Sequence, residues 1–276
     1  MQLPNHYTHL APFRDFFRTG NPILMYHHVG PRRRGVRIKG LYVSPELFAQ
    51  QMAELAADGF TTPAFGAATC DHADSFPSTS LGGSNAGQRI FITFDDGFRD
   101  VFEHALPVLQ QHRFRAIQFL LPELLGKTNE WQLRQGDVIE PLMDPAQVRD
   151  WLIAGQEIGA HTLHHFRLTQ IPPAQACEEI TESKKKLEDL FGVAVEHFCY
   201  PYGDWNATVR DLVQEAGYRS ACTTAFGINT PATPPFALKR ITARYRSRRF
   251  GAWLRRWWFR RKCCDSHSFA HLRNAE

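Results

Sequence analysis

Two adjacent carboxylates, Asp95 and Asp96, end the apolar run IFITF, which predicts a buried strand. Neighbouring anions repel each other. A bound cation relieves this conflict, because one carboxylate can ligate a metal while the other remains available as a base. Gly97 permits a sharp turn that brings both side chains to one site. Taken alone, the same residues also fit an Asp-Asp-Gly turn at the surface.

A histidine cluster follows a second strand-like run in EIGAHTLHHF. His161 and His165 are four residues apart, a spacing that places two side chains on one side of a helical turn and within reach of one ion. His164 competes for the same role, although it is only three residues from His161. One isolated histidine here would be interpreted as a polar surface residue, whereas a cluster favours a metal site.

Two further segments place polar groups after apolar runs. In FCYPYGDWN, Pro201, Tyr202 and Gly203 form a turn that can present backbone N–H groups to a developing oxyanion, although such turns are also common without function. In ILMYHHVG, His27 and His28 end the first predicted strand.

Short apolar runs alternate with longer amphipathic ones along the chain, a pattern typical of βα units around a parallel sheet. Such folds gather their catalytic loops at the carboxyl ends of the strands, where the segments above lie. Glycines after four of the helices are predicted C-cap residues, namely Gly59, Gly155, Gly192 and Gly217. Predicted strands span 23–27, 89–94, 116–121, 157–160, 196–200 and 219–223, and predicted helices span 44–58, 98–111, 145–154, 173–191 and 206–216.

The succession TFDDG, HTLHH and YPYG resembles the polysaccharide deacetylase family of carbohydrate esterases, also called NodB-homology domains, over roughly residues 22–241. The segment ILMYHHVG is similar to that of a subgroup whose barrel is circularly permuted. The resemblance implies an α/β fold, a distorted (β/α) barrel. It also implies Asp95 as the base and His27 as the acid, with His28 as the neighbour to test against it. The implied metal ligands are Asp96, His161 and His165.

The resemblance implies a metal-dependent hydrolase that releases acetate from an N-acetylated amino sugar of a polysaccharide, oligosaccharide or lipid-linked glycan. The metal and the backbone N–H of Tyr202 would face the oxyanion, and Pro201, Trp131 and Arg240 are the expected substrate contacts. Two imidazoles and one carboxylate suit zinc, while cobalt, nickel, iron and manganese accept the same ligand types.

The third motif departs from the family pattern. Many members carry an arginine before its proline, whereas this chain has Cys199 and Tyr200 there. Arg240, in ALKRI, resembles a strand-end arginine of the subgroup and is the candidate that would orient the base instead. The alternative is an ordinary surface arginine.

Two other functions fit the same motifs. One is hydrolysis of another C–N bond, such as an N-formyl group or a cyclic imide, because loops rather than the catalytic residues choose the substrate. The other is a non-catalytic carbohydrate-binding or membrane-associated protein that keeps the scaffold. The intact acidic and histidine motifs argue against the second alternative.

Composition sets the compartment and the domains that we expect. The first twenty residues hold no unbroken apolar run, and no stretch approaches the roughly 20 apolar residues that cross a bilayer, so we expect a cytoplasmic protein. Six cysteines without a CxxC pair indicate reduced thiols. We expect an N-terminal extension (1–21), a deacetylase barrel (22–245) and a basic tail (246–276). Residues 70–88 are predicted to form a loop, and 127–144 a lid or rim over a pocket.

Charge is distributed unevenly along the chain. Residues 239–262 carry +11, and the rest of the chain carries −7. Within 250–262 an apolar stripe of Phe250, Trp253, Leu254, Trp257 and Trp258 is typical of a helix resting on an anionic membrane, where it would bring the enzyme to a lipid-linked sugar. A terminal helix packed on the barrel is the alternative. Nucleic-acid binding is not expected, because no recognition fold accompanies the charge.

Overall fold

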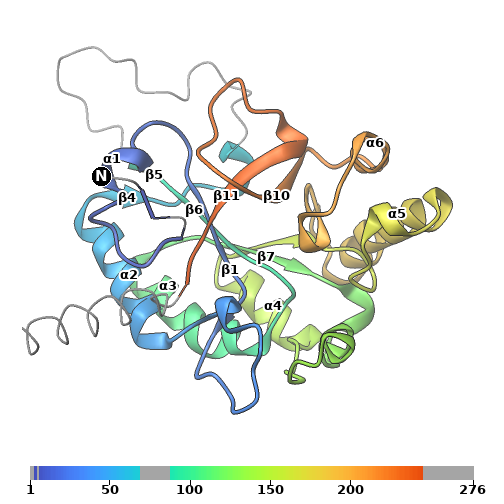
Figure 1. Cartoon of the computed structure of the whole chain (residues 1–276), viewed down its shortest axis with the longest axis horizontal. Helices are drawn as coiled ribbons and strands as arrows, with labels where there is room; N and C mark the ends of the chain where they lie inside the picture. Colours follow the sequence, from blue (N-terminus) through green and yellow to red (C-terminus); the bar gives the residue numbers. More distant parts are fainter. Residues whose placement is uncertain (1–2, 5, 69–87, 245–276) are drawn as a thin grey trace, which may run out of the picture. The chain divides into compact units, whose positions relative to one another are not determined.

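The computed structural model describes residues 3–4, 6–68 and 88–244. Within them, seven parallel strands form a closed barrel in the order β1-β11-β10-β9-β8-β7-β6 (Figure 1). The barrel closes because β1 pairs with both β6 and β11, and this confirms the predicted (β/α) barrel. The strands are β1 (Ile23–Tyr26), β6 (Phe91–Phe94), β7 (Ile117–Leu120), β8 (Glu157–Ala160), β9 (His197–Cys199), β10 (Ser220–Phe226) and β11 (Leu238–Thr242).

Strand residues alternate between the barrel interior and the layer of helices. In β1, Ile23 packs in an interior cluster with Phe91 and Ile117, whereas Leu24 and Tyr26 belong to the larger cluster that the helices cover. The interior cluster fills the amino end of the barrel. By the same alternation, polar residues further along the strands face inward at the carboxyl end.

The helices begin where the sequence offers caps. The Ser44 hydroxyl accepts a hydrogen bond from the Leu47 N–H, and Asp144 forms a capping box with Gln147. The glycines predicted to follow four helices, Gly59, Gly155, Gly192 and Gly217, all have positive φ angles. The helices are α1 (Arg14–Phe17), α2 (Pro45–Ala57), α3 (Leu106–His112), α4 (Pro145–Ile153), α5 (Pro173–Phe191) and α6 (Ala207–Glu215).

The structure differs from the predicted elements in three places. The helix expected over 98–111 starts as a π-helical turn, Val101–Ala105, because Pro107 has no N–H to donate to the preceding turn. Strand β11 was not predicted from the sequence, because Lys239 and Arg240 interrupt its apolar pattern. Two short ladders also form, between β2 (His28–Val29) and β3 (Tyr42–Val43) and between β4 (Phe60–Thr61) and β5 (Gln88–Arg89).

The described part of the N-terminal segment packs against the barrel. Tyr7, Leu10, Phe13 and Phe17 are buried in the main cluster, and the Tyr7 N–H donates to the Thr242 carbonyl over 2.8 Å. Cys177, Cys199 and Cys222, the cysteines within the described ranges, are free. Residues 70–87 of the loop predicted over 70–88 lie outside the described residues, as does the basic tail with its apolar stripe, whereas Gln88 begins β5. No helix in the described ranges has the length and apolar character to cross a membrane.

Candidate active site

A cavity of about 300 Å³ opens at the carboxyl end of the barrel. It gathers residues from four separate stretches of the chain that sequence analysis singled out, together with Trp131 from the segment predicted as a lid or rim. The predicted residues that line it are His27, Asp95, Asp96, Trp131, His161, His165 and Tyr202.

Asp96, His161 and His165 meet in a geometry that suits a metal ion. Asp96 Oδ1 lies 3.3 Å from His161 Nε2 and 3.2 Å from His165 Nε2, and the three side chains are buried. Ligands held about 2.0–2.2 Å from a tetrahedral zinc ion are roughly 3.3 Å apart, so these separations fit. Asp96 Oδ1 has no hydrogen-bond partner among the described residues, as expected for an atom that awaits a ligand.

The two imidazoles are held by their surroundings. His161 Nδ1 lies 2.6 Å from the Cys199 carbonyl oxygen; a hydrogen bond donated there leaves the Nε2 lone pair facing Asp96. The His165 ring stacks on Trp131, with ring centres 4.7 Å apart, and meets the Tyr202 ring edge-on at 4.5 Å. Both histidine nitrogens are thus directed at one point before any ion binds.

Arg240, from β11, forms a two-pronged ion pair with Asp95. Arg240 Nη1 and Nη2 donate to the two carboxylate oxygens over 2.7 and 2.8 Å, and the guanidinium also donates to the Thr93 hydroxyl and the Thr223 carbonyl. Burial works to raise the pKa of Asp95, but the charge and hydrogen bonds of Arg240, with smaller contributions from His27 and His161, hold that pKa below its usual range. At neutral pH the carboxylate is therefore ionised, as a base must be.

His27 faces Asp95 across the cavity. Its Nε2 lies 3.7 Å from Asp95 Oδ2, so the expected acid and the expected base border the same space. Burial lowers the pKa of His27 below its ordinary value, although Asp95 and Asp96 act in the opposite direction.

His28, which sequence analysis left as the competing acid, lies outside the cavity. Its Nδ1 is 2.8 Å from Asp100, and its ring stacks against Tyr42 and Phe98. Strand alternation explains why His27 and not His28 faces the cavity, because the side chains of consecutive residues point to opposite faces of the sheet.

Three other predicted residues are placed away from the cavity lining. His164 lies 2.7 Å from Glu179, so it does not join the ligand set. Pro201 is buried behind the turn it opens. Arg240 is buried in its contacts with Asp95 and does not line the cavity, so it is placed to orient the predicted base and not to make the substrate contact expected for it.

Backbone strain is concentrated at this site. Asp96, Thr162, His165 and Tyr202 have φ angles of 75°, 70°, 64° and 60°, in the left-handed region that non-glycine residues avoid. Each such residue costs roughly 1–3 kcal/mol and persists where the surrounding structure enforces it. Two metal-ligand candidates and the proposed oxyanion turn therefore depend on their tertiary contacts.

A second group, Asp95, His161 and Cys199, also brings three potential ligand atoms together. Burial raises the pKa of the Cys199 thiol to about 11, so it is protonated at neutral pH. Arg240 Nη2 lies 3.2 Å from its sulfur, and Cys199 does not line the cavity. The group around Asp96 is therefore the better metal site.

Sequence analysis missed several residues of the cavity wall. They come from loops, short 3-10 helical turns and β10, without a recognisable motif, and they are Ile38, Leu41, Gln132, Thr224 and Arg244. Thr242 also lines the cavity, and alternation along β11 would have indicated the direction of its side chain if that strand had been predicted.

Comparison with known proteins agrees with the motifs. The family model described as polysaccharide deacetylase matches residues 82–221, about half of the chain. Bacillus subtilis YxkH, provisionally named a polysaccharide deacetylase, is 26% identical over 221 residues, which cover 80% of this chain and 70% of the relative.

Two further proteins are similar. A Staphylococcus aureus poly-β-1,6-N-acetyl-D-glucosamine N-deacetylase is 24% identical over 160 residues, 55% of this chain and 53% of that enzyme. The fold matches the structure of the Streptococcus pyogenes deacetylase PplD with a TM-score of 0.68 at 23% identity, over 81% of this chain and 92% of that one.

Proposed function

The chain belongs to the polysaccharide deacetylase family, and we propose that it is a metal-dependent hydrolase that releases acetate from an N-acetylated amino sugar of a glycan. The observation that carries this proposal is the convergence of Asp96, His161 and His165 beside a carboxylate held in its ionised form. Asp96 Oδ1 is buried and accepts no hydrogen bond from the residues that the structure describes, which supports a cation at this point. Two imidazoles and one carboxylate suit zinc.

Amide hydrolysis needs an activated water, stabilisation of an oxyanion and a proton for the departing nitrogen. A divalent ion, when bound, would supply Lewis-acid activation of the water and of the acetyl carbonyl. Asp95 accepts the proton of the attacking water, because Arg240 keeps it ionised. The turn at Tyr202 faces the oxyanion through its backbone N–H, a contact worth roughly 3 kcal/mol in other enzymes.

His27 completes the reaction by protonating the leaving nitrogen. Its lowered pKa makes it neutral at pH 7 in the free protein, so it must first gain a proton. The neighbouring Asp95 holds the proton taken from water, and only 3.7 Å separates the two side chains. A proton passed between them converts the spent base back into a carboxylate and charges the acid when it is needed.

An N-acetylated glycan is the proposed substrate, supported by the name of the staphylococcal relative. Aromatic groups in the cavity suit a sugar, since Trp131 and Tyr202 line it beside the proposed metal ligands His161 and His165.

Acetate release from an N-acetylglucosamine oligomer tests the proposal. We expect activity in protein loaded with zinc, its loss after treatment with a chelator, and its return when zinc is added. Protein that contains one zinc ion per chain and releases no acetate from any N-acetylated oligomer would overturn it.

A further inference from the structure

We propose that the loop of residues 31–39, beside the active-site cavity, binds an acidic group that the glycan carries next to its N-acetylated sugar. The group is a phosphate or a carboxylate. This inference rests on the proposed deacetylase function and narrows its substrate to acidic glycans.

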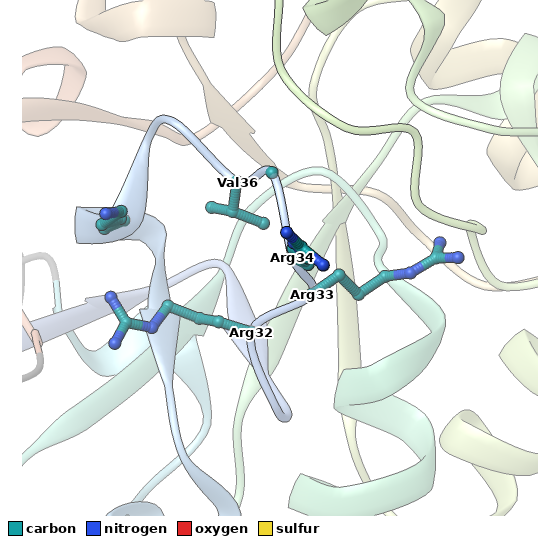
Figure 2. A pocket seen from close by; sticks show the side chains of 6 residues that line it. Arg32, Arg33, Arg34 and Val36 are labelled. Atoms are coloured by element: carbon teal, nitrogen blue, oxygen red, sulfur yellow. The ribbon is translucent and has the colours of Figure 1, made fainter.

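The loop encloses a hollow of about 260 Å³ lined by Arg32, Arg33, Arg34, Gly35, Val36 and Lys39. Four of these residues are cationic and none is acidic. The cations are exposed, while Val36 is buried and anchors the turn. Figure 2 shows the side chains of Arg32 and Arg33 extending to opposite sides of the loop, with Arg34 and Val36 between them.

Nearby carboxylates are engaged in holding the loop in place. Asp137 accepts hydrogen bonds from the backbone N–H groups of Arg37 and Ile38 over 2.9 and 2.7 Å. Glu140 accepts from Arg33 over 3.3 Å. Within the described ranges, Arg34 and Lys39 have no ion-pair partner, so their charges remain available to a ligand.

The hollow adjoins the catalytic cavity. Ile38 and Leu41, on either side of Lys39 and Gly40, line that cavity, and so does Arg244. The Arg244 guanidinium lies against Gly40, where a Cβ atom would meet its central carbon at 3.3 Å. A glycan with its N-acetylated sugar in the cavity would therefore place a neighbouring unit over the cationic loop.

The concentration of charge is unusual for this part of the chain. Residues 31–40 contain five Lys or Arg and no Asp or Glu, whereas the chain outside 239–262 carries a net charge of −7. Guanidinium groups bind phosphate and carboxylate oxygens in pairs, and a cationic rim also attracts an anionic substrate from a distance. An acidic glycan is the substrate class that uses both effects.

The test compares two substrates that differ only in charge: a neutral N-acetylglucosamine oligomer, and the same oligomer with a phosphate monoester on one sugar. Because exposed ion pairs are individually weak, we expect kcat/KM for acetate release to favour the phosphorylated oligomer roughly 3- to 10-fold at low salt, and less at high salt. In Arg34→Ala/Lys39→Ala this ratio falls to about 1.

The matched control is Arg113→Ala/Lys185→Ala, which removes two exposed charges, from the end of α3 and from the outer part of α5. It keeps the wild-type ratio. Equal kcat/KM for the two oligomers in the wild type, or an unchanged ratio in Arg34→Ala/Lys39→Ala, would overturn the proposal.

Calorimetric binding separates this inference from the proposed function. If neither oligomer is hydrolysed, the deacetylase proposal fails, while tighter binding of the phosphorylated oligomer to the wild type than to Arg34→Ala/Lys39→Ala still supports an anion site. Equal binding to both proteins contradicts that site. Competition by inorganic phosphate shows that the loop recognises the phosphate alone, and its absence shows that the glycan is also needed. If inorganic phosphate does not compete and both proteins bind the phosphorylated oligomer equally, the anion site is refuted.

Discussion

Arg240, which is buried and does not line the cavity, donates to both carboxylate oxygens of Asp95 over 2.7 and 2.8 Å. The two residues are 145 positions apart in the chain. The family pattern predicts an arginine before the proline of the third motif, where this chain has Cys199 and Tyr200. Here β11 supplies it, and Cys199 contacts the same guanidinium through its sulfur.

The first prediction concerns this pair. Arg240→Lys retains the charge but loses the two-pronged contact, so Asp95 is misplaced and kcat should fall roughly 100-fold with a smaller change in KM. The pKa of Asp95 should rise when the guanidinium is lost. Because the base must be ionised, the acid limb of the pH–rate profile moves to higher pH. Arg219→Lys, at an exposed pair with Glu196, is the control.

Arg240→Ala removes one partner of a buried ion pair and should lower the free energy of unfolding by roughly 3–5 kcal/mol, measured by denaturant titration. A purely structural role would lower stability in both variants but leave the pH–rate profile of folded Arg240→Lys where it is in the wild type.

The second prediction separates the two neighbouring histidines. His27→Gln should lower kcat roughly 10²- to 10⁴-fold, since it removes the proton donor, while zinc content stays at the wild-type value. His28→Gln loses the contact with Asp100 and the stacking on Tyr42 and Phe98, so it should reduce stability by roughly 1–3 kcal/mol and leave kcat close to that of the wild type. The reverse pattern would transfer the acid role to His28.

The third prediction concerns stability at acid pH. Burial, reinforced by Arg219 and Lys184, lowers the pKa of His197 to about 4. Between the ordinary value of 6.5 and about 4, the unfolded chain binds a proton that the folded protein excludes, so stability falls as pH falls through this range. The full loss is about 3 kcal/mol.

His197→Gln removes this titration and keeps a group that can hydrogen-bond to Ser220. Its free energy of unfolding should change less than that of the wild type between pH 6.5 and 4. Parallel curves for the two proteins would contradict the assignment.

The sequence predicted β1, β6, β8 and β9, which carry the motif residues of the site, because each combines an apolar run with polar residues at its end, but it did not predict β11. Alternation along β1 directs His27 into the cavity and His28 away from it, whereas the motif alone left either histidine as a candidate for the acid. Burial of Arg240 could not be predicted in the same way, because a charged side chain inside a barrel is stable only when its partners are supplied by other strands. Ile38 and Leu41 depend on the β2–β3 pairing and on Asp137, which are tertiary features.

The most direct test is the zinc content of Asp96→Ala after equilibrium dialysis, measured beside its rate of acetate release. The wild type should retain one ion per chain, as should Asp189→Ala, which removes an exposed carboxylate from α5. Asp96→Ala should lose both the ion and the activity, because Asp96 Oδ1 is the oxygen that both imidazoles face. Full zinc content together with full deacetylase activity in Asp96→Ala would contradict the account.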